Sequence, residues 1–260
     1  PLHPSPLAPI GKVYELSTLV REGTHAAVAM VRHEDTYYQL TVRRADAEAP
    51  QDALKGLARA ADIDLPEAIG DHLAGASGCF VEDTLVLAWT EPAGEGDGRC
   101  RLARVVPDGS VELGAEFPEP VTVYSDRRIV RVGDGLAVLG TRRRAGEIEL
   151  VVRWLDARAE RVVRTTVLSP DVARIGPQLA AAPDGVVVSW YEERTGGIWL
   201  AAAPAVAGPL SGPVRLNDPA NRTAYAGTSL VPAAAAGAWR VFWNDPWDGA
   251  YAVYTTVRVP

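Results

Sequence analysis

Acidic side chains recur at matching points of this chain, and their type could support catalysis on a sugar. At three of these matching points the acid follows a tryptophan by two residues, and these acids are Glu91, Glu192 and Asp245. Two carboxyl groups on either side of a glycosidic bond can act as general acid and as base or nucleophile. We therefore predict these three as the catalytic residues. In a glycoside hydrolase two of them would lie roughly 5 to 10 Å apart.

Further polar and aromatic side chains near the same points could bind a ligand. Arginine can clamp an anion, carboxylates and amides can bind hydroxyl groups, and an indole can stack on an apolar face. The predicted ligand-binding residues are Arg142, Arg143, Arg174, Glu193, Arg222, Tyr225, Asn244 and Trp247. In the first repeat, the matching position is Arg32 or His33. The alternative for each residue is a polar strand end that forms a solvated ion pair.

These residues must be positioned by short strands, and the clearest set of strands spans residues 178–216. A turn of the Pro-Asp-Gly type at 183–185 separates a short apolar run from 186–191, which is β-branched and aromatic. That composition is typical of a buried strand. A polar turn with Gly196 and Gly197 leads to a third strand, and a Gly/Pro-rich loop leads to a fourth. The stretch therefore predicts one antiparallel sheet of four strands.

The same unit recurs along the chain, and the end of its second strand marks the register. This anchor position is occupied by Met30, Trp89, Gly140, Trp190 and Trp243, roughly fifty residues apart. A repeat of this length that is built of strands is typical of a β-propeller. We predict an all-β fold, a five-bladed β-propeller of four-stranded antiparallel blades in a single domain over residues 1–260. The blades are expected at about 11–45, 77–117, 126–168, 178–216 and 228–259.

Residues 50–74 interrupt this pattern. Leu54 and Leu57 lie at helical spacing, and Pro66 suits the first turn of a second short helix. We therefore expect a helical insertion between blades 1 and 2, either as a plug over a blade edge or as a lid over a site. Blade 5 ends after its third strand, so it stays three-stranded or is completed by a strand near 13–19.

The two cysteines, Cys79 and Cys100, fall on the predicted first and third strands of one blade. Strands separated in this way lie about 9.5 Å apart, which is too far for an undistorted disulfide. We therefore favour two small buried thiols over a bond.

Composition excludes several functional classes. The net charge of −7 argues against a dedicated nucleic-acid binder. The four histidines show no ligand spacing, so neither a metal site nor a cofactor is predicted. No apolar run is long enough for a transmembrane segment. Residues 1–10 are linker-like, and we expect a secreted, periplasmic or lipoprotein-anchored bacterial protein that is a monomer.

Residues 178–216 resemble the sialidase-like (BNR-type) β-propeller repeat. The resemblance is carried by VVVSWYEERTGGIWLAAAP, with its Trp-x-acid strand end, and by the later GPVRLND. It implies a propeller fold and a glycan as ligand or substrate, because that superfamily contains exo-acting glycosidases and glycan-binding proteins. The chain departs from the enzymes in lacking an S-x-D-x-G-x-T-W box. It also has Val130 where their arginine motif carries proline.

Three functions remain in competition. The first is a propeller that binds a small polar ligand, most plausibly a glycan, in a polar funnel on one face. It would act as a glycoside hydrolase if two carboxylates face each other. The second is a non-catalytic scaffold that presents its rim to another protein. The third is a lyase or cyclase of a biosynthetic pathway.

Overall fold

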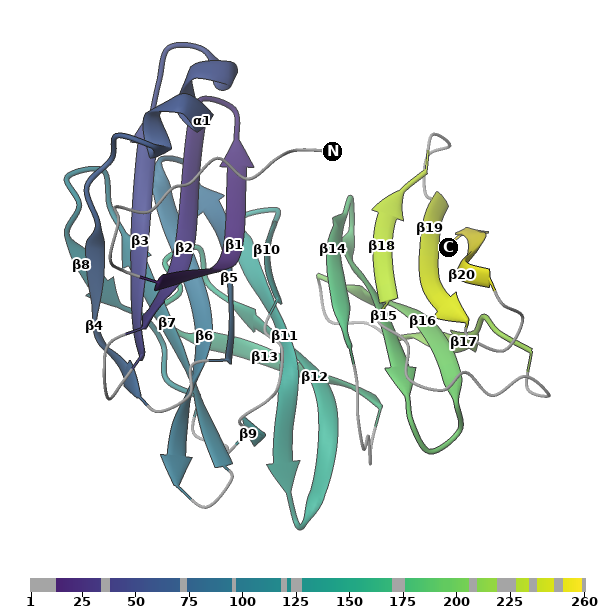
Figure 1. Cartoon of the computed structure of the whole chain (residues 1–260). Helices are drawn as coiled ribbons and strands as arrows, with labels where there is room; N and C mark the ends of the chain where they lie inside the picture. Colours follow the sequence, from purple (N-terminus) through teal and green to yellow (C-terminus); the bar gives the residue numbers. More distant parts are fainter. Residues whose placement is uncertain are drawn as a thin grey trace. The chain divides into compact units, whose positions relative to one another are not determined.

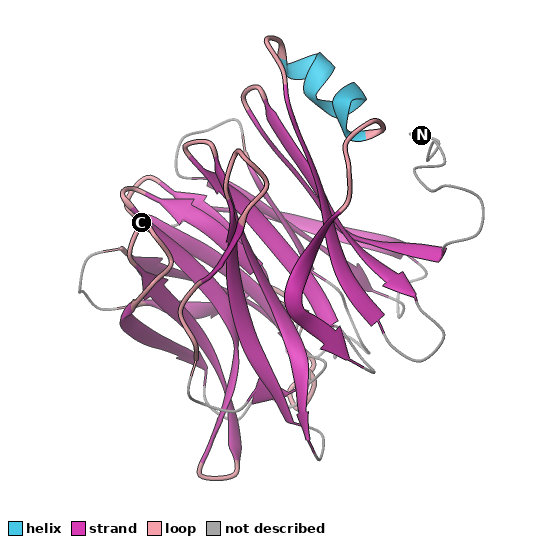
Figure 2. Ribbon diagram, turned by 90° about the vertical axis from the view of Figure 1, so that its left-hand side faces the viewer, coloured by secondary structure: helices cyan, strands magenta, loops and turns pink. Residues whose placement is uncertain are grey.

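The computed structural model is built almost entirely of antiparallel β-strands (Figure 2). It forms two compact units, Pro1–Arg127 and Arg128–Pro260. The structure describes residues 13–33, 38–70, 74–94, 97–117, 121–122, 128–169, 176–205, 210–218, 228–233, 238–245 and 250–258. Within these residues the strands form five sheets, which confirms the predicted all-β class and the number of sheets.

The first unit holds two sheets (Figure 1). The first sheet has the order β1-β2-β3-β4, and the second has the order β5-β6-β7-β8, with β9 paired to β7. Their strands are β1 (Val13–Glu22), β2 (His25–His33), β3 (Tyr38–Asp46), β4 (Ile63–Gly70), β5 (Ala74–Val81), β6 (Thr84–Gly94), β7 (Asp97–Val105), β8 (Val111–Leu113) and β9 (Val121–Thr122).

The first sheet corrects the predicted helical insertion. One helix, α1 (Pro50–Leu57), lies within the expected range, but the predicted second helix is instead the strand β4. The helix therefore lies between the third and fourth strands of one sheet, not between two sheets. Pro66 is tolerated because β4 is an edge strand whose pairing with β3 is irregular at this point. With eight residues, α1 is far too short to cross a bilayer, and it is the sole helix of the described residues.

The two faces of β2 pack against different elements because side chains alternate along a strand. Ala27, Ala29 and Val31 lie in a core with side chains of the second sheet, such as Trp89. The intervening side chains of β2 pack against α1, which lies on the other face of this sheet (Figure 1). The helix thus covers a sheet face, as a structural plug would.

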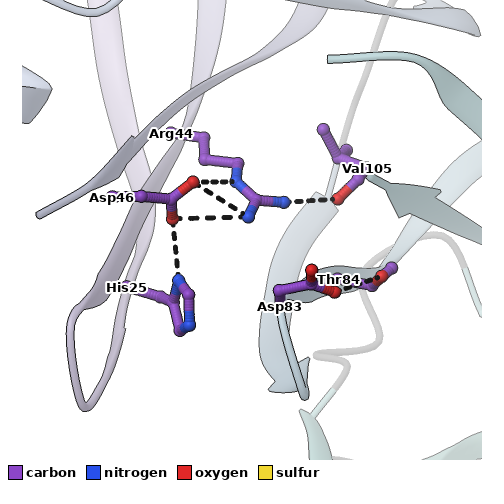
Figure 3. Close-up of polar contacts among 6 residues, drawn as sticks. All are labelled: His25, Arg44, Asp46, Asp83, Thr84 and Val105. Atoms are coloured by element: carbon purple, nitrogen blue, oxygen red, sulfur yellow. Dashed lines mark hydrogen bonds and ion pairs between the residues drawn. The ribbon is translucent and has the colours of Figure 1, made fainter. Parts of the chain in front are cut away.

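A polar network joins the first two sheets at the end where β2 begins (Figure 3). Asp46 accepts from Nδ1 of His25 at 2.8 Å and pairs with both Nε and Nη2 of Arg44. Arg44 also donates to the Val105 carbonyl at 3.1 Å, and its guanidinium lies 5.8 Å from the centre of the Phe80 ring. Because Val105 and Phe80 belong to the second sheet, the network fastens it to the first.

The second unit holds the other three sheets. Their orders are β10-β11-β12-β13, β14-β15-β16-β17 and β18-β19-β20, and we call them the third, fourth and fifth sheets. The strands are β10 (Arg128–Val132), β11 (Gly135–Arg144), β12 (Glu147–Leu155), β13 (Val162–Ser169), β14 (Gln178–Ala182), β15 (Gly185–Glu192), β16 (Gly197–Pro204), β17 (Ser211–Arg215), β18 (Thr228–Pro232), β19 (Ala238–Asp245) and β20 (Ala250–Arg258).

Consecutive sheets of the second unit pack face to face. The first strands of neighbouring sheets contact each other, β10 with β14 and β14 with β18. Trp154 and Trp190 belong to the core between the third and fourth sheets, and Trp243 belongs to the core between the fourth and fifth. These contacts are the sheet-on-sheet packing expected of neighbouring propeller blades.

The anchor positions are confirmed, since each lies on the second strand of its sheet. In the described residues the fifth sheet has three strands, and the strand near residues 13–19 is β1, an edge of the first sheet. The proposed completion of blade 5 by that strand is therefore wrong. Cys79 lies on β5 and Cys100 on β7, and both are thiols; Cys100 is buried as predicted, whereas Cys79 is only half-buried.

Candidate functional site

In each sheet, the edge where the second strand turns into the third carries predicted site residues. We call this edge of a sheet its hairpin edge. Glu91 lies near the end of β6, Arg142 near the end of β11, Glu192 at the end of β15 and Asp245 at the end of β19. The repeat thus places them at equivalent points, as the sequence predicted.

Glu91 is held by a cation from the next strand. Its Oε1 accepts from Nε of Arg101 at 2.7 Å, and Arg101 also pairs through Nη1 with Glu116. The hydrogen bond to Glu91 raises the pKa of Arg101 above its ordinary value, against the lowering effect of burial. The Glu91 residue is only 9% exposed, and its Oε2 has no hydrogen-bond partner among the described residues.

Trp89, two residues before Glu91 on β6, carries a second unpartnered group. Its indole Nε1 is buried and finds no hydrogen-bond partner in the described part of the chain. Residues two apart on a strand point to the same face, so the Trp89 ring and the Glu91 carboxylate share one face of β6. A buried polar group without a partner costs about 1–3 kcal/mol. A hydroxyl group or a water could satisfy either group, because it donates and accepts.

Arg142 occupies the position on β11 that Glu91 occupies on β6, and it also forms an ion pair with the third strand of its sheet. Here the second strand carries the cation and the third strand carries the carboxylate. It lies directly opposite Glu149 on β12, and its Nε donates to Glu149 Oε2 at 2.5 Å. Both side chains are largely buried, with exposed fractions of 10% and 15%. Arg143 is half-buried on the opposite face of β11, so the two predicted ligand-binding arginines point away from each other.

Glu192 differs from Glu91 because Gly197, not a cation, lies opposite it on β16. Its Oε2 accepts from the Thr195 hydroxyl at 2.5 Å, within the turn that joins β15 to β16. Glu193, the next predicted residue, is exposed on that turn. Beneath Glu192 the rings of Trp190 and Trp199 stack with centroids 6.5 Å apart. Both indole Nε1 groups are buried without a hydrogen-bond partner in the described residues.

A second group of polar residues at the same edge was missed by the sequence reasoning. Arg128, Gln178 and Thr228 are the first residues of β10, β14 and β18. Arg128 Nε donates to Gln178 Oε1 at 3.4 Å, and Thr228 lies 3.2 Å from the Ser189 hydroxyl while donating to the Gly176 carbonyl. Their fifty-residue spacing matches the anchor repeat and was the available signal.

The other predicted residues lie outside what the structure describes. No side chain is described for Arg32, His33, Asn244 or Asp245, although their backbones belong to β2 and β19. The remaining ones are Arg174, Arg222, Tyr225 and Trp247. Among the predicted residues that the structure does describe, Glu91, Arg142 and Glu192 are bonded to partners that were not predicted.

Metal binding finds no support in the described ranges, where no three His, Cys, Asp or Glu side chains gather as a ligand group. The hairpin edge instead offers hydrogen-bonding groups fixed by their neighbours: a carboxylate, a guanidinium, hydroxyls and indole N–H groups. Such groups suit a neutral, hydroxyl-rich ligand.

No family model matches the sequence, and no curated protein matches it either. Solved structures do resemble it. An α-L-arabinofuranosidase from Lactobacillus brevis is 10% identical with a TM-score of 0.52, covering 96% of this chain and 91% of that one. An exo-β-1,3-galactanase from Phanerochaete chrysosporium is 11% identical with a TM-score of 0.52, covering 92% and 58%. A polysaccharide lyase is 9% identical with a TM-score of 0.50, covering 92% and 57%.

These similarities concern the fold. The glycoside hydrolases among the similar structures are five-bladed propeller enzymes, in agreement with the five sheets of this chain. Identities near 10% transfer no catalytic residue, because one fold hosts many activities.

Proposed function

We propose that this chain is a single five-bladed propeller domain that binds a glycan at the hairpin edge of its sheets. The observation that carries the proposal is the buried Oε2 of Glu91, which lacks a hydrogen-bond partner among the described residues, as does Nε1 of Trp89 on the same strand. A sugar hydroxyl can donate to a carboxylate and can accept from an N–H, so it suits either group.

The surroundings of Glu91 favour binding by a fixed carboxylate. Arg101 holds Oε1 in place, so Oε2 is presented in a defined direction without further loss of side-chain entropy. The same Trp-x-Glu arrangement recurs at Trp190 and Glu192 in the fourth sheet. We propose that each of these two sheets can bind glycan hydroxyl groups at its own hairpin edge, as expected from the resemblance of residues 178–216 to sialidase-like repeats.

Glycoside hydrolysis is the second candidate, and Glu192 favours it. No cation faces this carboxylate across the strand pair, whereas Glu91 is neutralised by Arg101. Glu192 is therefore the better general acid or base, and Asp245 is its proposed partner at a distance of roughly 5 to 10 Å. We further propose that the protein acts as a monomer outside the cytoplasm, where polymeric glycans are met.

A thermal-shift screen tests the proposal. The probes are α-L-arabinofuranosides and β-1,3-galactotriose, chosen from the names of structurally similar enzymes and their ligands, together with an acidic polysaccharide. A ligand at a hundredfold excess over its dissociation constant adds about 2.7 kcal/mol to stability, which is readily seen as a higher melting temperature. A shift with one sugar class supports glycan binding. No shift with any probe contradicts it and favours the protein-interaction scaffold.

Hydrolysis is tested separately by measuring product release from the sugar that binds. Glu192→Gln removes the acid–base group while keeping the hydrogen bond from Thr195, so it should abolish turnover and preserve binding. Binding without turnover by the unaltered protein would leave glycan binding standing and exclude the hydrolase for that sugar.

A further inference from the structure

The turn that carries the partner of Glu192 is fastened by a buried asparagine from another part of the chain. Residues 193–196 join β15 to β16, and Gly196 adopts the left-handed conformation with φ of 61°. Asn217 follows β17 and is only 8% exposed. Its side chain reaches the turn.

Asn217 bonds the turn through both ends of its amide. Nδ2 donates to the Gly196 carbonyl at 2.8 Å, and Oδ1 accepts from the backbone N–H of Ile198 at 2.9 Å. These two bonds bracket the point where the turn enters β16. A side-chain amide that is satisfied in this way fixes the local backbone more firmly than strand pairing alone.

Arg215 extends the clamp to Thr195 itself. Its Nε donates to Asn217 Oδ1 at 3.1 Å, which orients the amide, and its Nη2 donates to the Thr195 carbonyl at 3.3 Å. The chain of contacts therefore runs from Asn217 and Arg215, through the backbone of residues 195–198, to the Thr195 hydroxyl and the Glu192 carboxylate.

We propose that Asn217 is a positioning residue for Glu192: it holds the turn in the conformation in which Thr195 orients the carboxylate toward a ligand. Its effect on ligand binding rests on the proposed function, whereas its effect on the turn does not. Asn217 need not touch the ligand, since its amide is directed at the backbone of Gly196 and Ile198.

The test compares Asn217→Ala with Ser211→Ala, a matched control. Ser211 also bonds β17 to β16, through the backbone of Ala202, but at the far end of the strand pair. Hydrogen exchange should become at least tenfold faster in residues 193–198 of Asn217→Ala, and mass-spectrometric labelling of the Glu192 carboxyl should rise. Ser211→Ala should change neither. Exchange as slow as in the unaltered protein would overturn the proposal.

Three further variants keep the test decisive if Asn217→Ala folds poorly. Asn217→Asp retains the two bonds accepted by Oδ1 and loses the donor to Gly196, so its exchange should be intermediate. Thr195→Val should raise Glu192 labelling without the tenfold exchange effect, and Thr195→Ser should restore the normal labelling because it keeps the hydroxyl.

Affinity for β-1,3-galactotriose or an α-L-arabinofuranoside supplies the last readout. Binding should fall at least tenfold in Asn217→Ala and in Thr195→Val, and should be unchanged in Thr195→Ser and Ser211→Ala. Faster exchange with unchanged affinity would overturn the positioning role. If the unaltered protein binds neither these sugars nor the acidic polysaccharide, the proposed function fails, and the exchange and labelling results alone support or overturn the role of Asn217.

Discussion

Arg101 donates to Glu91 Oε1 at 2.7 Å and leaves Oε2 of the same carboxylate buried without a hydrogen-bond partner among the described residues. The pair formed by Arg142 and Glu149 occupies the equivalent point of the third sheet with the charges exchanged. Both repeats therefore have an ion pair between the second and third strands, with the charges on opposite strands. The second strand carries the acid Glu91 in one sheet and the base Arg142 in the other.

We expect stability to require an ion pair between positions 142 and 149, whichever of the two positions carries the positive charge. Arg142→Glu places two carboxylates together in a largely buried position and should lower the free energy of unfolding by about 3 kcal/mol. The exchange variant Arg142→Glu/Glu149→Arg should recover more than half of that loss, because the residues couple directly. Urea unfolding of the single and double variants measures both.

The control for this exchange lies on the same hairpin. Arg144 and Glu147 face each other nearer the turn and are both exposed. Exchanging them should change stability by less than about 0.5 kcal/mol, as for other surface pairs. An equal loss of stability at both pairs would show that burial does not strengthen the pair of Arg142 and Glu149.

Gly197 is required by the packing of Trp199. A Cβ at this position would lie 2.5 Å from Trp199 Nε1 and 2.9 Å from the Thr195 hydroxyl. Gly197→Ala should therefore destabilise the protein by about 1–3 kcal/mol and shift its tryptophan fluorescence. At Gly212 in the same sheet a Cβ meets nothing within 4 Å, so Gly212→Ala should be close to neutral. Equal stability of the two variants would contradict the packing of Trp199.

Asp108 provides a test of pH dependence in the turn between β7 and β8. The backbone N–H of Ser110 donates to its carboxylate at 2.8 Å and, with the Ser110 hydroxyl, lowers the pKa of Asp108. A lowered pKa stabilises the fold above the ordinary pKa, and this stabilisation is lost as the pH falls through the folded value. In carboxyl NMR titrations, Ser110→Ala should keep most of the lowering, because the backbone donor remains. A return to the ordinary pKa would assign the effect to the hydroxyl.

The sheets were predictable because their signals are local. The strand around Trp190 is β-branched and bounded by turn residues, and its copies repeat at a constant spacing. β4 was missed because its proline and its apolar spacing read as a helix start. Only the pairing of β4 with β3, which depends on residues far away in the sequence, makes it an edge strand with a tolerated Pro66.

The candidate site was predictable only in part. The sequence placed Glu91, Arg142 and Glu192 at the hairpin edge, because repeat position determines this. It could not show that Arg101 and Glu149 neutralise two of them, since a register slip of one residue moves every side chain to the other face. The contact of Asn217 with the turn could not be predicted, because it depends on tertiary packing.

The central claim is that the unpartnered oxygen of Glu91 binds a ligand hydroxyl. Calorimetry should compare Glu91→Gln with Glu116→Gln, using the sugar that gives the largest shift among the arabinofuranosides, galactotriose and the acidic polysaccharide. Glu91→Gln can keep the bond to Arg101 and place an NH₂ group where Oε2 was, whereas Glu116 binds the same arginine with a side chain that is 69% exposed. We predict at least a tenfold loss of affinity for Glu91→Gln, equal to about 1.4 kcal/mol, and less than a twofold change for Glu116→Gln. Unchanged affinity in Glu91→Gln would contradict the account.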